Sequence, residues 1–260
     1  MILKEKDIRG IEIFLEKFGI KRKENSLNFV GEILSKFKNL PYENMTKITY
    51  SEEKDINKKL RTPFYIVKDF FEKGAGGTCF SLVYFLKSIF DYLGFNSKFV
   101  LADRNYGEDT HCALILNFEN KEYLVDIGYS IYEPIEINDK KIFKNFAYEF
   151  LMEEKEKYIF VYTITKNGNL KFRYKIKKED VPFEKFLDAW EKSFYFEMMN
   201  YIVVTKIKDD SLIYLRDKNF HIIKDGKTYY KKIEEDEIPL ILKNLGFKED
   251  LFFKAKSFLK

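Results

Sequence analysis

The stretch Gly-Ala-Gly-Gly-Thr-Cys-Phe-Ser, residues 74–81, decides how this chain is organised. Three of its first four residues are glycine, and the lack of a Cβ atom allows the backbone to turn sharply. From Phe80 the chain is almost wholly apolar as far as Gly94, which predicts a buried helix ending at that glycine. We therefore expect the turn to present Cys79 at an exposed edge, in the first turn of a core helix. The unpaired N–H groups and the helix dipole there favour a thiolate over a thiol.

A histidine and an aspartate further along the chain complete a candidate catalytic set. His111 lies in the strand-like run 110–116, and Asp126 lies in the next run, 122–129. A lone carboxylate in an apolar strand needs a partner. In a hairpin with the four-residue loop 117–120, His111 and Asp126 would lie directly opposite each other. A cysteine at a helix start together with this pair gives the Cys-His-Asp arrangement of thiol acyl transfer.

At these residues the chain resembles the arylamine N-acetyltransferases. Their nucleophile segment has the pattern Arg-Gly-Gly-x-Cys-Phe-Glu, and residues 75–81 read Ala-Gly-Gly-Thr-Cys-Phe-Ser. Their histidine heads a strand, as His111 does, and their Val-Asp-x-Gly-Phe-Gly segment is similar to Val-Asp-Ile-Gly-Tyr-Ser at 125–130. Upstream, Asn-Leu-Pro-Tyr-Glu-Asn-Met at 39–45 resembles their Ile-Pro-Phe-Glu-Asn-Leu segment. The order and spacing of the motifs agree across about a third of the chain.

Three positions depart from the family pattern. Ala75 stands where the family usually has Arg, Ser81 where it has Glu, and Ser130 where it has the last Gly of the aspartate segment. A Glu at position 81 would form a capping box with Thr78, so Ser81 makes the start of the helix less firmly held. None of the three removes a catalytic group, so they bear on substrate choice and efficiency.

The resemblance implies a ping-pong acyltransferase. Cys79 would attack the acyl thioester of coenzyme A, and an amine would then attack the acyl-enzyme. His111 would act as the base, and Asp126 would hold its ring. The donor would be acetyl-CoA, and the acceptor an arylamine, a hydrazine or a related small amine. The resemblance also places other residues near the reaction: Tyr42, Thr110 and Tyr129 at the acceptor pocket, and Gly107 and Glu108 near coenzyme A.

The spacing of apolar residues divides the chain into three parts. Residues 1–95 show helical spacing, the period of strands begins at about 96, and helical spacing returns at the end. The pair Asn167-Gly168 between two alternating runs signals a tight hairpin. We expect an α+β fold with a cysteine-protease-like Cys-His-Asp core. Its parts would be an N-terminal helical bundle carrying the nucleophile (1–95), a central antiparallel β-barrel or sheet carrying His and Asp (96–185), and a C-terminal α/β lid (186–260).

The composition indicates which kinds of partner and which cellular compartment to expect. The formal net charge is +4, and lysine and glutamate are interleaved rather than clustered, so we expect no nucleic-acid partner. Two cysteines argue against a disulfide framework and for a reducing compartment. The N-terminal residues show no signal-peptide pattern, and no apolar run is long enough to span a bilayer. We expect a cytoplasmic protein without a membrane partner, working as a monomer or weak homo-oligomer.

The remaining cysteine and histidine have simpler interpretations. Cys112 follows His111 on a strand, so we expect it to point to the opposite face and to fill the core. Because these two side chains point apart, and because no ligand pair has finger-like spacing, we expect no metal site. His221, in a late hairpin, is expected to be structural.

Two other functions remain open at this stage. The same three side chains serve thiol hydrolases and amide-exchange enzymes, and the discharge of the acyl-enzyme by water or by an amine separates these possibilities. The third possibility is a binding protein that kept the fold and lost catalysis, and the three departures from the family pattern motivate it.

Overall fold

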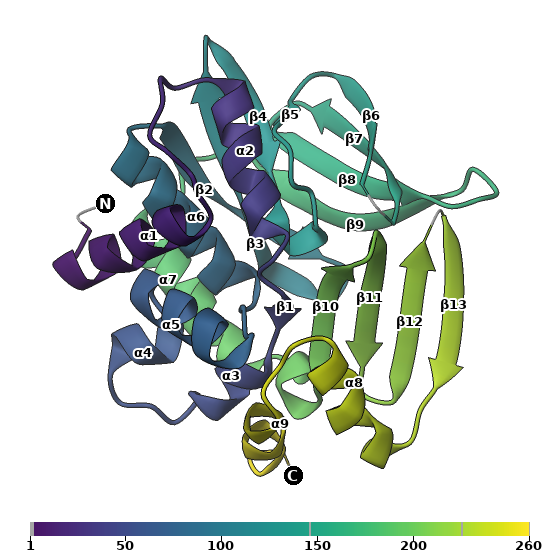
Figure 1. Cartoon of the computed structure of the whole chain (residues 1–260). Coiled ribbons are helices and arrows are strands. Elements are labelled where there is room, and N and C mark those ends of the chain that lie inside the picture. The colour runs from purple at the N-terminus through teal and green to yellow at the C-terminus, as the bar shows by residue number, and fades with distance from the viewer. Residues whose placement is uncertain (1–2, 146, 225, 260) are drawn as a thin grey trace.

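The structure is a computed structural model that describes residues 3–145, 147–224 and 226–259 of the chain. Helices from the first part of the chain pack against an eight-stranded sheet, and a five-stranded sheet lies beside them (Figure 1). The helices of the first part are α1 (Glu5–Lys17), α2 (Leu27–Phe37), α3 (Met45–Thr49), α4 (Ile56–Leu60), α5 (Pro63–Lys73) and α6 (Cys79–Leu93).

The helix α6 lies at the centre of the molecule. All of its residues except Asp91 and Tyr92 are buried, as expected for a helix that is apolar on nearly every side. It begins at Cys79 and ends at the cap residue Gly94, whose φ of 85° lies in the left-handed region that favours glycine. The predicted core helix that starts at the cysteine is therefore confirmed.

The eight-stranded sheet has the order β5-β4-β3-β2-β9-β8-β7-β6, and it curls into a nearly closed antiparallel barrel (Figure 1). One face of β2 and β3 packs on the helices, and the alternate residues fill the barrel interior. The predicted hairpin joins β8 and β9, where Gly168 has a φ of 77°. The strands are β2 (Asn96–Arg104), β3 (Gly107–Phe118), β4 (Lys121–Val125), β5 (Ile135–Glu136), β6 (Lys140–Lys144), β7 (Glu149–Lys155), β8 (Tyr158–Ile164) and β9 (Leu170–Lys177).

The five-stranded sheet has the order β1-β10-β11-β12-β13. Its first strand comes from the helical part of the chain, because Tyr42 of β1 pairs with Thr205 of β10. The helices α8 and α9 pack on this sheet through a separate apolar core. The elements are β1 (Tyr42–Glu43), α7 (Phe183–Lys192), β10 (Val203–Lys208), β11 (Ser211–Arg216), β12 (Asn219–Lys224), β13 (Lys227–Lys232), α8 (Ile238–Asn244) and α9 (Glu249–Lys256).

The α+β fold class predicted from the sequence is confirmed. The boundaries of its three parts stay a prediction, and two elements link those parts. The strand β1 belongs to the last sheet, and α7 buries Phe186 and Trp190 in the helical core. No helix within the described residues has the length and hydrophobicity that a bilayer crossing requires.

Candidate active site

Cys79 follows a turn in which only glycine fits. A Cβ atom at Gly76 would lie 1.8 Å from the carbonyl oxygen of Pro41, and one at Gly77 would lie 2.3 Å from a side-chain oxygen. Real Cβ atoms do not approach other atoms this closely, so a side chain at Gly76 would displace the backbone of the turn, and one at Gly77 would force the Ser81 hydroxyl to move. Backbone hydrogen bonds fix it further: Gly77 N–H donates to Pro41 (3.2 Å), and Glu43 N–H donates to Gly77 (3.0 Å).

Cys79 itself is buried, with 5% of its surface exposed. The prediction that it lies at an exposed edge is therefore wrong. The thiol belongs to the apolar core around α6, and Arg104 and Tyr42 lie close enough to it for their charges to interact. These neighbours come from distant elements, β2 and β1, whose packing over the turn leaves no trace in local periodicity.

His111 and Asp126 form a buried pair. Their Nε2 and Oδ2 atoms lie 2.9 Å apart, and both side chains are fully buried. Asp126 is also the cap of a short 3-10 helix, where its Oδ1 accepts the backbone N–H of Tyr129 at 3.2 Å. The carboxylate thus has partners on both oxygens, as a charge inside a protein requires.

The hairpin that carries this pair differs from the predicted one in its loop. The strands β3 and β4 join through two residues, Glu119 and Asn120, with φ of 48° and 60°, instead of four. Leu114 pairs with Val125, so Asp126 follows the end of β4 and lies two positions along from His111 rather than directly opposite. The two side chains still share a face, because the loop keeps an even number of residues.

The second nitrogen of His111 is also occupied. Arg104 Nη2 donates to His111 Nδ1 at 2.9 Å. A guanidinium has only donors, so Nδ1 is the acceptor, and we assign the ring proton to Nε2, facing Asp126. Burial lowers the pKa of His111, but the charge and hydrogen bond of Asp126 outweigh it, and the net shift is upward. Protonation at Nδ1 therefore requires Arg104 to move away.

The nucleophile candidate has an activated thiol. The pKa of Cys79 lies well below its ordinary value, first because of a hydrogen bond with Cys112, and then through His111 and Arg104; burial opposes this shift. The pKa of Cys112 is raised by burial and by Cys79, so Cys112 is the donor of the pair. Cys112 is fully buried, as expected of a core residue, but its contact with Cys79 was not predicted.

Gly128 allows the three candidate residues to meet. A Cβ atom on it would lie 2.8 Å from Cε1 of His111, 3.1 Å from Cβ of Cys79 and 3.3 Å from Oδ1 of Asp126. These three side chains, far apart in the chain, therefore surround a space smaller than one methyl group. Thus Gly128 is required here for close approach rather than for its backbone angles.

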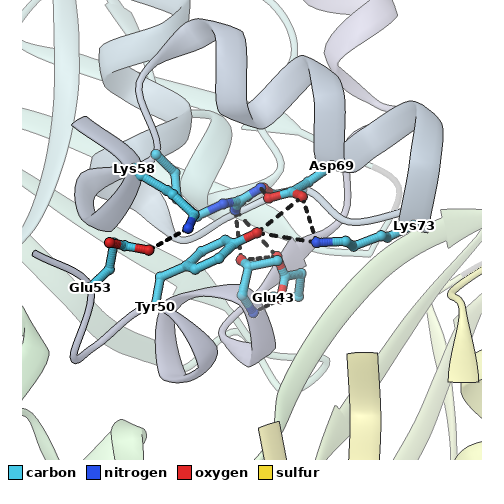
Figure 2. Close-up of polar contacts among 9 residues, drawn as sticks. Glu43, Tyr50, Glu53, Lys58, Asp69 and Lys73 are labelled. Carbon is cyan, nitrogen blue, oxygen red and sulfur yellow. Dashed lines mark hydrogen bonds and ion pairs between the residues drawn. The ribbon is translucent and has the colours of Figure 1, made fainter. Parts of the chain in front are cut away.

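A buried polar network lies behind the glycine turn (Figure 2). Arg61, with 2% exposure, ion-pairs with Asp69 (3.2 Å) and Glu43 (3.5 Å). Its Nη1 donates to the carbonyl of Gly76 and to Oγ1 of Thr46. Burial raises the pKa of Glu43, whereas Arg61 acts to lower it. The guanidinium thus ties two buried carboxylates to the turn that precedes the nucleophile.

The structure shows the surroundings of the three positions that depart from the family pattern. Ala75 is fully buried, and Arg61 brings a guanidinium to the carbonyl of the very next residue. Ser81 Oγ donates to the carbonyl of Thr78 at 3.1 Å. Ser130 adopts a φ of 58°, in the left-handed region where the glycine of the family would sit without strain.

Two residues predicted at the acceptor pocket lie at this site. The ring of Tyr129 is 5.1 Å from that of His111, edge to face. Tyr42 is close enough to Cys79 for their charges to interact. The other predicted residues lie at the start of β3, where Oγ1 of Thr110 donates to the carbonyl of Gly107 at 3.0 Å and Glu108 is exposed. Their roles in binding stay predictions.

Sequence reasoning missed Arg61, Arg104 and Gly128. The two arginines had no local signal, because each acts through atoms brought together only by folding. Gly128 did have one: it lies two residues after Asp126 in a run otherwise built of large apolar residues, and such an isolated glycine often marks a close approach.

Comparison with known proteins agrees with this geometry. Residues 27–248 match a family model described as N-acetyltransferase. The fold is similar to that of the arylamine N-acetyltransferase from Mycobacterium abscessus, with a TM-score of 0.81, 14% identity and 99% of both chains covered. The enzyme from Salmonella typhimurium gives 0.75, 11% identity, and 95% and 98% coverage of the two chains. Arylamine N-acetyltransferase C from Bacillus anthracis gives 0.72, 19% identity, and 95% and 100% coverage. A search of curated proteins finds no match.

The chain belongs to the N-acetyltransferase family, because the family model covers most of its length. It is therefore an enzyme, an N-acetyltransferase, and its fold is that of the arylamine N-acetyltransferases.

Proposed function

We propose that Cys79, His111 and Asp126 carry out the acetyl transfer in two half-reactions. The observation that carries this proposal is the meeting of all three side chains around Gly128, within 3.3 Å of one virtual methyl position. The lowered pKa of the Cys79 thiol and the 2.9 Å contact between His111 and Asp126 support it. A thiolate, a base and a carboxylate that orients the base are the groups that thiol acyl transfer needs.

In the first half-reaction, Cys79 Sγ attacks the thioester carbonyl of acetyl-CoA. A new C–S bond forms to the enzyme, and the C–S bond to coenzyme A breaks. The thiol proton passes through Nδ1 of His111 to the departing coenzyme A sulfur, so the products are acetyl-Cys79 and free coenzyme A. Backbone N–H groups in the first turn of α6 stabilise the oxyanion of the intermediate.

In the second half-reaction, the nitrogen of the acceptor amine attacks acetyl-Cys79. The C–S bond to the enzyme breaks, and an amide forms. His111 Nδ1 takes the proton from the attacking nitrogen and returns one to the sulfur. Asp126 accepts the Nε2 proton and so holds the imidazole with Nδ1 toward the reacting atoms, where it acts once Arg104 has moved off it.

The residues around Cys79 suggest where the acceptor amine and coenzyme A bind. We place the acceptor against Tyr42, Thr110 and Tyr129, and the pantetheine arm of acetyl-CoA along Gly107 and Glu108. A pocket of about 480 Å³ on the five-stranded sheet offers aromatic rings on which the adenine of coenzyme A could stack, although its arginine pairs with Glu197, and Asp217 adds a second carboxylate. Its lining is Glu197, Tyr201, Tyr214, Arg216, Asp217, Asn219 and His221.

The remaining expectations belong to the same proposal. The protein would act in the cytoplasm, as a monomer or weak homo-oligomer, on small molecules alone. Its three parts, 1–95, 96–185 and 186–260, would be its domains. The interleaved charges of the chain support the absence of a polyanionic partner.

The test is the intact mass of the protein after incubation with acetyl-CoA. Wild type should gain one acetyl group and lose it on addition of an arylamine. Cys79→Ser should gain none, whereas the matched variant Cys112→Ser should still gain one. Equal acetylation of Cys79→Ser and wild type would overturn the assignment of the nucleophile. Loss of the acetyl group at the same rate with and without amine would instead point to hydrolysis.

A further inference from the structure

The two cysteines of the chain lie in contact, although they are far apart in the sequence. Cys79 is the first residue of α6, and Cys112 lies on β3, directly after His111. Both are free thiols, both are buried, and a hydrogen bond joins them. The acetyl transfer described above has no step at Cys112. A second thiol therefore touches the nucleophile without taking part in the reaction.

The alternation of side chains along β3 produces this contact. Cys112 and Leu114 belong to the apolar cluster that also contains Cys79, whereas Ala113 and Ile115 fill the barrel. Cys112 therefore lies on the face of β3 that packs on the helices, and its backbone is held by pairing with β2. The two sulfur atoms are thus brought together by a helix and a strand of the core, which fix positions more precisely than loops do.

The two thiols differ in reactivity. The pKa of Cys79 lies well below its ordinary value, first because of the hydrogen bond with Cys112, whereas burial raises the pKa of Cys112 well above its ordinary value. At neutral pH the first is therefore a thiolate and the second a thiol, and the thiolate is the form that peroxides oxidise. Cys79 also retains 5% exposure, whereas Cys112 has none. Oxidation by a peroxide therefore starts at Cys79.

An oxidised Cys79 is already in contact with a reaction partner. A cysteine sulfenic acid either meets a thiol and forms a disulfide, or meets more peroxide and goes on to the irreversible sulfinic and sulfonic acids. Cys112 touches the sulfur of Cys79 before oxidation begins, so the step within the chain has the advantage of proximity. Thiols from solution have to enter a site in which little of Cys79 is exposed. The arrangement favours a disulfide within the chain.

We propose that Cys112 is a resolving thiol, which forms a disulfide with Cys79 after a hydroperoxide has oxidised the nucleophile. This inference rests on the proposed function, because the disulfide stops acetyl transfer only if Cys79 is the nucleophile. The disulfide holds the enzyme in an inactive form and protects Cys79 from irreversible oxidation. Reduction by a dithiol restores the catalyst.

The chemistry takes two steps. The Cys79 thiolate attacks one oxygen of hydrogen peroxide, an S–O bond forms, the O–O bond breaks, and the second oxygen leaves as hydroxide. The sulfur loses two electrons, and the peroxide gains them. The sulfur of Cys112 then attacks that of Cys79, an S–S bond forms, the S–O bond breaks, and the thiol proton leaves with the hydroxyl group as water. A dithiol such as dithiothreitol reverses the change by thiol–disulfide exchange and is itself oxidised.

The test treats wild type and Cys112→Ala with excess hydrogen peroxide, without acetyl-CoA, until the activity of each is lost. Wild type should lose two hydrogen atoms in intact mass, yield one peptide pair that links positions 79 and 112, and regain activity in dithiothreitol. Cys112→Ala should gain oxygen at Cys79, and the fraction of activity that dithiothreitol restores should be roughly 10-fold smaller than in wild type. Cys112→Ser should behave like Cys112→Ala, because both lack the sulfur, so a packing defect of one variant is recognised.

The matched control is Cys79→Ser, which keeps the other cysteine. It should form no disulfide, and Cys112 should stay alkylatable after unfolding, because a buried thiol is not the first to be oxidised. Wild type that has first been acetylated by acetyl-CoA should resist the loss of two hydrogen atoms, since the acetyl group occupies the sulfur of Cys79.

Three results would overturn the inference: wild type that gains oxygen without forming the disulfide, a disulfide that links two chains, or equal recovery of activity in wild type and Cys112→Ala. The disulfide is measured without acetyl-CoA, so the two proposals fail separately. Wild type that forms acetyl-Cys79 but no disulfide would refute this inference alone. Wild type that forms the disulfide but gains no acetyl group would refute the proposed function.

Discussion

Replacement of Arg61 by alanine is the most informative perturbation of the nucleophile turn. The side chain is 2% exposed and neutralises Asp69 and Glu43 at 3.2 and 3.5 Å. Arg61→Ala leaves Glu43 in the interior without its cation, leaves Asp69 with only Lys73 at 2.8 Å, and leaves the carbonyl of Gly76 without its donor. Removing one partner of a buried ion pair costs about 3–5 kcal/mol. In a chain of this size that corresponds to a fall in Tm of roughly 6–20 °C.

The pH dependence of this loss gives a second, independent readout. Burial already raises the pKa of Glu43 above its ordinary 4.5, and Arg61 acts to lower it, so the variant should raise it further. A carboxyl whose folded pKa exceeds its unfolded pKa destabilises the fold above the folded pKa, and this penalty disappears as the pH falls through that value. The stability deficit of Arg61→Ala should therefore be largest near pH 7 and should shrink towards pH 5.

Urea unfolding followed by circular dichroism at both pH values measures this deficit. The control Arg9→Ala, at an exposed position, should change the free energy of unfolding by less than about 0.5 kcal/mol. The combination Arg61→Met and Glu43→Gln should recover much of the loss, because it removes the unpaired carboxylate and leaves Asp69 paired with Lys73. If Arg61→Ala loses no more stability than Arg9→Ala, the view that this guanidinium holds the network together is refuted.

Three further predictions concern the immediate surroundings of the thiol. Gly128→Ala places a methyl group 2.8 Å from Cε1 of His111, so kcat should fall on the order of 100-fold with little change in Tm; an unchanged kcat would contradict the close packing. Cys112→Ala removes the donor to Cys79, so the pKa of Cys79, followed as the pH dependence of iodoacetamide alkylation, should rise; an unmoved midpoint would contradict the contact. Burial lowers the pKa of Lys47 from 10.5 to about 7, so the free energy of unfolding should rise with pH across that interval. In Lys47→Met this rise of the unfolding free energy with pH, measured by urea titration, should be smaller. The same dependence on pH in the variant and in wild type would contradict the prediction.

Much of the fold was readable from the sequence because its elements are long and regular. The run from Phe80 to Gly94 contains few polar residues, so a core helix was expected. The hairpin at Asn167-Gly168 was predicted because these two residue types accept the positive φ angles of a tight turn, which few other residues do. By contrast, β1 has two residues and β6 is almost wholly exposed, so neither produces a periodic pattern.

The candidate site was predictable in its residue types but not in its surroundings. Cys79, His111 and Asp126 stood out because each is unusual in its own local segment. The burial of Cys79 was not predicted, since residues that lie near it come from β1 and β2. The predicted length of the loop between β3 and β4 was wrong. Glu119 and Asn120 both adopt a positive φ, so two residues are enough to connect the strands instead of the four expected. The prediction that His111 and Asp126 lie on the same face of the hairpin was right, because it requires only an even number of residues in the loop.

The strand β1 ties the order of the nucleophile turn to the last part of the chain. Glu43 is bonded to Gly77 on one side, and Tyr42 and Glu43 pair with β10 on the other. Contacts between residues so distant in sequence form slowly, after local helices are in place. During synthesis, Cys79 leaves the ribosome well before the strand that fixes its turn. The nucleophile turn therefore reaches its final order only after β10 has been translated, and a chain terminated before Val203 would carry the thiol without the strand that pairs with β1.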